Sequence, residues 1–189
     1  MTPLSLGIFA SANTTVGTSF ESIATVSVGA GGASSVTFSS IPSTFTHLQI
    51  RGISRTVNAA NDYRNGRIEF NSDSNTNYST HVLRGDGSAA STDAGVSNAF
   101  SYPYVSVDDS TTASTYAGFV IDILDYANTN KFKTVRALSG ADYNGAGVIN
   151  FASGLWRSTS AITSIKLDNF SSVNWKQNSH FALYGIRSA

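Results

Sequence analysis

Three histidines, His47, His81 and His180, are the side chains of this sequence best suited to acid–base chemistry near neutral pH. They lie far apart in the sequence, and each falls inside a stretch predicted to be a β-strand. The signatures HExxH, GxSxG and GxxxxGK(S/T), which place zinc ligands, a serine nucleophile or a phosphate loop, do not occur. The sequence therefore predicts no catalytic residue and favours solvated or cross-strand histidines, and a Ser–His–Asp site assembled from distant positions remains the alternative.

Carboxylates form a second set of candidates, because glycoside hydrolysis needs two of them across a cleft. The sequence offers the adjacent pair Asp108–Asp109, and it also offers Asp122 and Asp125. Asp122 interrupts the most apolar stretch of the chain, where an unpaired charge is costly. We expect a cation on a neighbouring strand, Arg136 or Lys133, to neutralise Asp122, which makes this carboxylate structural.

Two short motifs resemble binding sequences. Asn71–Asn77 (NSDSNTN) places a side-chain oxygen at every second position, as calcium loops do. The EF-hand pattern fails because Thr76 stands at the required glycine, Val82 stands at the required glutamate, and Asp73 is the only charged ligand. We expect an Asx turn and no metal. Arg84–Asp86 spells an integrin-type tripeptide, which we interpret as ordinary turn chemistry after a strand.

Four aromatic residues, Tyr102, Tyr104, Trp156 and Trp175, lie in or beside segments predicted to be loops. Exposed rings with Asn and Asp neighbours stack on sugars in β-sandwich lectins, and Tyr and Trp also anchor protein interfaces. The four residues are therefore candidates for a glycan or a protein contact. Packing of at least one tryptophan in the core is the alternative.

The composition narrows the classes of function. Charged residues make up 13% of the 189 residues, about half of the usual share, whereas Ser, Thr and Asn account for 64 residues. The 12 basic and 12 acidic residues cancel and form no basic cluster, which argues against a nucleic-acid partner. Cysteine is absent, which excludes disulfides, Cys-ligated zinc and thiol catalysis, and no cofactor is predicted. A neutral, hydroxyl-rich surface favours assembly.

Neither a secretory signal nor a membrane span is predicted. The first basic residue is Arg51, so no positive charge precedes the mildly apolar run Met1–Ala12. No apolar run approaches the roughly 20 residues of a transmembrane helix. We expect a protein that is soluble when made.

Strand patterns dominate the chain, and no segment shows a helical stripe with caps. In Thr46–Gly52, Leu48 and Ile50 alternate with polar residues, which is typical of a strand with one buried face. Tyr116–Leu124 is the longest apolar run and predicts a central strand covered on both faces. The other predicted strands are Glu21–Val28, Ser35–Ser39, Arg67–Asn71, Tyr78–Leu83, Thr134–Leu138, Val148–Ala152, Ala161–Leu167 and His180–Ile186.

About ten short strands separated by turn residues predict an all-β protein with a single β-sandwich or jelly-roll-like domain. The glycine-rich segment 29–32 predicts a hairpin between the first two strands. Residues 86–115 are interpreted as a long excursion with one edge strand. Residues 1–19 show no alternation, so we expect an N-terminal arm at 1–19 and the sandwich domain at 20–189.

A succession of distinctive motifs runs along the chain. They are FESIATVSVG at 20–29, VTFSSIPSTF at 36–45, HLQIR at 47–51, FNSD at 70–73, NYS at 77–79, GDG at 85–87, IDILDYAN at 121–128, KFKTV at 131–135, GLW at 154–156, SAITSI at 160–165 and FALYGI at 181–186. This succession resembles a family of structural proteins of tailed bacteriophages that is frequent among aquatic and cyanobacterial phages. The resemblance spans residues 20–187 and implies a β-sandwich virion component, capsid-associated or in a tail fibre, with no enzymatic activity and no transferable binding residue.

The chain contains no repeat that would build a fibre shaft, which favours a protein that attaches to a preformed shell. We expect a non-enzymatic capsid decoration, cement or head-fibre protein of the virion, assembled in the host cytoplasm onto the major capsid protein or other virion proteins. Its arm would attach through Leu4, Leu6, Ile8 and Phe9, and a symmetric homo-oligomer, a trimer above all, is expected. The alternative is a tail-fibre or receptor-binding module for host-surface glycans, and a small cell-envelope hydrolase is a third hypothesis.

Overall fold

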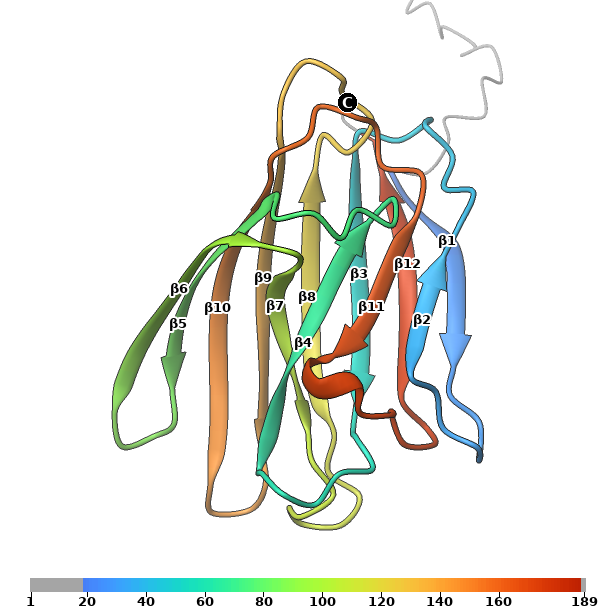
Figure 1. Cartoon of the computed structure of the whole chain (residues 1–189). Coiled ribbons are helices and arrows are strands. Elements are labelled where there is room, and N and C mark those ends of the chain that lie inside the picture. Colours follow the sequence, from blue (N-terminus) through green and yellow to red (C-terminus); the bar gives the residue numbers. More distant parts are fainter. Residues whose placement is uncertain (1–18, 188–189) are drawn as a thin grey trace, which may run out of the picture.

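The computed structural model describes residues 19–187, which form two antiparallel sheets packed face to face (Figure 1). The large sheet contains, in spatial order, β1 (Phe20–Ser27), β12 (His180–Ile186), β3 (His47–Ser54), β8 (Ala117–Leu124), β9 (Lys133–Asp142), β10 (Gly147–Trp156), β5 (Tyr78–Gly85) and β6 (Ala90–Asn98). The small sheet contains β2 (Ser35–Phe38), β11 (Ile165–Asn169), β4 (Tyr63–Phe70) and β7 (Ser101–Val107), and the 3₁₀ helix η1 (Phe170–Ser172) follows β11.

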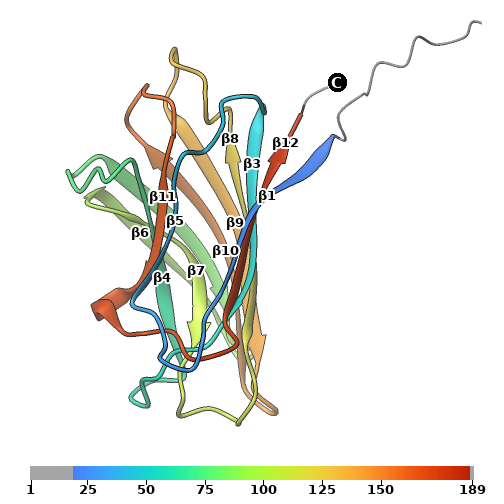
Figure 2. The same cartoon turned by 90° about the vertical axis from the view of Figure 1, so that its right-hand side faces the viewer.

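This architecture confirms the predicted all-β sandwich, with twelve strands where about ten were expected. Figure 2 shows the two sheets as separate layers, with β4 and β11 of the small sheet beside the large sheet. Within residues 19–187, no helix is long and apolar enough to cross a membrane. The predicted arm residues Leu4, Leu6, Ile8 and Phe9 lie outside the described residues.

The core lies between the sheets and is built by strands that alternate buried and exposed side chains. Leu48 and Ile50 of β3 are fully buried, as predicted, and so are Ile68 and Phe70 of β4. Each such side chain contributes about 1.5–3 kcal/mol when it leaves water. The alternation of period two therefore fixes which face of each strand belongs to the core.

Three glycines hold aromatic rings of the core in flat contact with the backbone. At each of them an added Cβ would lie within 2.4 Å of a ring atom, so only glycine fits. The pairs are Gly52 with Phe119, Gly66 with Tyr104, and Gly185 with Phe45. Because these rings are buried, the glycines are part of the packing.

The predicted hairpin between the first two strands is wrong. The chain turns at Gly29–Gly32, where the Gly32 N–H donates to the Gly29 carbonyl at 3.0 Å, but it then crosses to the other sheet. β1 pairs with β12 in the large sheet, and β2 pairs with β11 in the small sheet. A glycine-rich turn between two strands is compatible with both outcomes, and the distant partners decide between them.

Two further expectations are corrected. Residues 86–115 contain two strands: β6 is the exposed edge of the large sheet, and β7 is an edge strand of the small sheet that is buried along most of its length. β8 is central, as predicted, but only one of its faces is covered, since Ala117, Phe119, Ile121 and Ile123 are buried and the alternate residues are not. The apolar outer face of β8 therefore remains accessible in the described chain.

Candidate functional site

A row of apolar side chains crosses the outer face of the large sheet. Val120, Leu138, Phe151 and Leu83 stand in direct cross-strand register on β8, β9, β10 and β5. Leu138 is 53% exposed, Phe151 51% and Leu83 53%, and no described segment covers them. We call these four residues the outer row. Contiguous exposed apolar side chains of this kind mark interaction sites on soluble proteins.

Shallow grooves flank the outer row. Gly118, Gly140 and Gly85 share the next register position with Ile149, which is 56% exposed. A groove of about 460 Å³ runs along this step, and a second of about 460 Å³ lies between Leu83 and Phe151. The outer face thus has grooves into which side chains of a partner can fit.

Asp122, a carboxylate beside the outer row, is paired. Arg136 lies opposite Asp122 on the neighbouring strand, with Nη2 at 3.3 Å from Oδ2, which confirms one of the two predicted partners. The Gln49 amide donates to the other Asp122 oxygen at 2.8 Å. Lys133, the other predicted partner, is buried and donates to three backbone carbonyls instead. Asp122 is therefore a structural residue.

Three of the four candidate aromatics belong to the core, which corrects their prediction as surface contacts. Tyr104 and Trp175 are fully buried and Trp156 is 2% exposed. The Tyr104 hydroxyl donates to the Asp168 carbonyl at 3.0 Å, and the Trp156 indole N–H donates to the Asp73 carboxylate at 2.7 Å. Large rings at strand ends pack between the sheets and still satisfy their polar atoms. None of the three can stack on a glycan.

Tyr102 is the candidate aromatic that stays at the surface. Its ring centroid lies 5.1 Å from that of Phe100 and 6.1 Å from that of Phe170 of η1, which is 47% exposed. The Arg67 guanidinium lies 4.6 Å from the Phe100 centroid. These rings form a continuous aromatic surface on the small-sheet side of the molecule, and sequence analysis identified only one of them.

The Asp108–Asp109 pair anchors the connection between β7 and β8. Asp108 is fully buried and accepts hydrogen bonds from Thr56, from Asn58 at 3.0 Å and from Arg64 at 3.0 and 3.3 Å. Asp109 accepts from Arg55, at 3.0 Å, and from Lys176, at 2.7 Å. All four carboxylate oxygens are thus engaged, which makes this pair structural and not catalytic.

His47 and the calcium-like loop also have structural roles. His47 Nδ1 accepts a hydrogen bond from the backbone N–H of Asp125 at 2.9 Å. His81 lies on β5, and His180 pairs with Ile53 at the other end of β3, so the three histidines do not come together. In the loop, Asp73 accepts the Asn75 backbone N–H at 3.0 Å, which is the predicted Asx turn. Within residues 19–187, no group of three or more His, Cys, Asp or Glu side chains is placed to hold a metal.

The Asp73 carboxylate links this loop to the core and makes stability depend on pH. Partial burial raises its pKa, but hydrogen bonds from Asn77, Trp156 and Asn75 outweigh that effect and lower the pKa from 3.8 to about 2. A folded-state pKa below the unfolded value stabilises the fold above pH 3.8, and this contribution is lost as the pH falls through about 2.

We therefore expect Asp73→Asn to melt at a lower temperature than the wild type near neutral pH. The difference in Tm should close as the pH falls from about 4 to about 2, because the wild-type carboxylate is then protonated. Thermal melts over this range measure it, with millimolar calcium added to a parallel series. A difference that stays constant with pH, or a Tm of the wild type that rises with calcium, contradicts the Asx-turn assignment.

A polar cleft opens where the beginning of β4 lies near the end of β5. It consists of two cavities of about 610 and 380 Å³ that share Asp62, Tyr63 and Arg84. We call it the Tyr63 cleft. The larger cavity is also lined by Ala60, Asn61, Arg64, Asn65 and Phe170, and the smaller by Asp86, Ser88, Ala89, Ser91, Tyr143, Ala146 and Gly147. Sequence analysis singled out Arg84 and Asp86 only as parts of a tripeptide.

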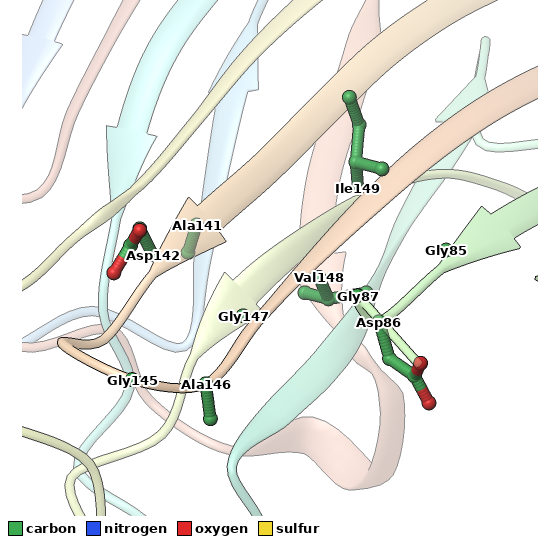
Figure 3. Close-up of a pocket in the computed structure, with 10 residues that line it drawn as sticks. All are labelled: Gly85, Asp86, Gly87, Ala141, Asp142, Gly145, Ala146, Gly147, Val148 and Ile149. Atoms are coloured by element: carbon green, nitrogen blue, oxygen red, sulfur yellow. The ribbon is translucent and has the colours of Figure 1, made fainter. Parts of the chain in front are cut away.

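A third cavity, of about 390 Å³, adjoins the cleft at the β9–β10 turn (Figure 3). Glycine backbone forms much of its lining, and its two carboxylates, Asp86 and Asp142, lie on opposite sides. Asp86 accepts hydrogen bonds from the Ala89 N–H at 2.8 Å and from the backbone and hydroxyl of Ser88, which lower its pKa to about 2. Asp142 accepts the Asn144 N–H at 2.8 Å. Both carboxylates cap their own turns, as was expected for Asp86.

Comparison with known proteins adds no relative. No protein-family model matches the chain, and no curated protein sequence matches it. The outer row, the Tyr63 cleft and the resemblance of the sequence motifs are therefore the features that bear on function.

Proposed function

We propose that this protein is a non-enzymatic structural component of a tailed-phage virion that binds the capsid surface through the outer face of its large sheet. The outer row is the observation that carries the proposal. Four apolar side chains in one register present a stripe that crosses β8, β9, β10 and β5. The partner is the major capsid protein or another virion protein, and a symmetric homo-oligomer, trimeric in our expectation, belongs to the same proposal.

The surroundings of the outer row support a protein partner. Asp122 and Arg136 already neutralise each other, so covering this pair strands neither charge, a loss that would cost several kcal/mol. Hydroxyl side chains, such as those of Ser153 and Thr134, also lie on the outer face. Such a surface forms hydrogen bonds at the rim of an interface without strong electrostatic repulsion.

We expect Phe151→Lys to lower the occupancy of the protein on purified particles by about tenfold, because a charged ammonium replaces a central apolar contact. Phe151 is half exposed, so the variant should fold with a free energy of unfolding within about 0.5 kcal/mol of the wild type. Quantitative gel analysis of particles assembled with each variant measures the occupancy.

Val57→Lys is the matched control, since Val57 is also 51% exposed but lies in the connection after β3, away from the outer row. Equal occupancy of the Phe151 and Val57 variants contradicts the proposed face. Deletion of residues 1–19 in the same assay shows how much of the occupancy depends on the predicted arm and how much on the outer row. Antibody label found only at the tail tip would overturn the capsid location.

A further inference from the structure

The Tyr63 cleft holds a guanidinium in a fixed position with one donor nitrogen left open. Arg84 Nε donates to the side-chain Oδ1 of Asn150 at 2.9 Å, and Nη2 donates to the side-chain Oδ1 of Asn65 at 3.1 Å. The guanidinium carbon lies 5.2 Å from the centroid of the Tyr63 ring. Arg84 Nη1 donates to no atom within residues 19–187. A donor immobilised by two amides and a ring loses little entropy when it binds a ligand.

Tyr143 brings a second open group to the same cleft. The residue is only 7% exposed, yet its hydroxyl has no hydrogen-bond partner in the described chain. Burial, together with the nearby Asp62 and Tyr63, raises the pKa of Tyr143 to about 12, so the phenol keeps its proton. The hydroxyl oxygen reaches the solvent of the smaller cavity, which makes it a donor available to a ligand.

Aromatic rings line the approach to these donors. Tyr63 borders both cavities and Phe170 borders the larger one. Phe170 in turn adjoins Tyr102, at 6.1 Å between centroids, and Tyr102 adjoins Phe100. Together the rings extend the cleft along the small-sheet side for a ligand longer than one ring. Exposed aromatic faces bind flat apolar C–H surfaces.

The charge of the cleft opposes anionic ligands. Arg64 also lines the cleft, but its guanidinium is already committed to the buried Asp108. Among the residues that line the cleft, Arg84 is then the cation without a carboxylate partner. The cleft also contains the two carboxylates of Asp62 and Asp86. A phosphate or an acidic sugar therefore meets more negative than positive charge, whereas neutral hydroxyl groups find both donors and acceptors.

We propose that the Tyr63 cleft binds a neutral saccharide. The sugar hydroxyls accept hydrogen bonds from Arg84 and Tyr143 and donate to Asp62, while the C–H face of a sugar ring packs on the exposed ring of Phe170. The site lies apart from the outer row and does not depend on the proposed capsid attachment. The cleft is a different site from the four aromatic residues proposed from the sequence, of which only Tyr102 lies next to it, through Phe170.

NMR titration of the full chain tests this site with maltose, cellobiose, lactose and diacetylchitobiose, each at about 10 mM, a concentration that reveals millimolar affinity. Glucuronic acid and inorganic phosphate are the anionic probes. We expect at least one neutral disaccharide to shift resonances of Tyr63, Arg84 and Tyr143. Its affinity should fall about tenfold in Arg84→Met and about fivefold in Tyr143→Phe, as lost hydrogen bonds from a charged and a neutral donor predict.

Tyr184→Phe is the matched control, because it removes the same hydroxyl from a tyrosine on the outer side of β12, and it should leave the affinity unchanged. Tyr143→Phe keeps the ring and so tests the site even if Arg84→Met destabilises the fold. Absence of shifts with all four sugars, binding of the anionic probes alone, or equal affinity of both cleft variants and the wild type would overturn the proposal. Capsid occupancy of the cleft variants should stay at the wild-type value, which separates this site from the outer row.

Discussion

Asp108→Ala is expected to lower the free energy of unfolding by about 3–5 kcal/mol, the usual effect of removing one partner of a buried ion pair. The substitution strands the Arg64 guanidinium, which is only 10% exposed and binds both oxygens of Asp108. It also leaves Thr56 and Asn58 without their acceptor. Urea unfolding followed by tryptophan fluorescence measures the change, since Trp175 pairs with Thr56 in the same region.

Asp122→Ala is the control for this effect. Its partner Arg136 is 57% exposed, so water replaces the lost carboxylate and the cost should stay below about 1 kcal/mol. If the two variants unfold at the same urea concentration, the buried network around Asp108 does not stabilise the fold as argued. A matching loss in Asp108→Asn would show that the negative charge itself is required.

Gly66→Ala is expected to cost about 1–3 kcal/mol, at the upper end of this range, because the new methyl group has no space. Its Cβ would lie 2.1 Å from two atoms of the Tyr104 ring. That ring cannot move aside, since it is fully buried, stacks on Phe119 at 4.5 Å and donates to the Asp168 carbonyl. The drop in Tm of the purified variant measures the cost.

The same change at Gly118 provides the comparison. Gly118 lies in a strand of the other sheet, and an added Cβ there meets no atom within 4 Å, so Gly118→Ala should stay within about 0.5 kcal/mol of the wild type. Combining Gly66→Ala with Tyr104→Leu should recover part of the loss, because the smaller side chain yields space. Additive effects of the two changes would contradict a direct clash.

The strands themselves were largely predictable, whereas their partners were not. Alternation identified β3 and the buried residues of β4 because each strand has one face in the core. The residues that pair in β1 and β12 are more than 150 positions apart, and nothing in a local pattern encodes that partnership. Only one edge strand was expected in residues 86–115, where the structure has two, because the exposed edge position of β6 leaves it without buried apolar residues.

The site was predicted less well than the fold. Trp156 ends β10 and Trp175 forms isolated bridges, so both lie next to loops in the sequence while their rings point inward. The Tyr63 cleft draws on residues from separate connections, which sequence spacing does not bring together. One signal was present in the sequence. Arg84 follows Thr80 and Val82 at alternate positions, on the face of β5 that points inward, and a buried arginine needs hydrogen-bond or charge partners.

The place of β12 between β1 and β3 has a consequence for how the chain folds during synthesis. Until residues 180–186 have left the ribosome, β1 has no neighbour and β3 exposes one backbone edge. The same holds for β2, whose partner β11 is also made late. Such distant pairings make folding slow, because a long loop must close before any contact compensates for the lost entropy. Nascent chains therefore present open strand edges for most of their synthesis, and binding by a chaperone at that stage would protect them from pairing with one another.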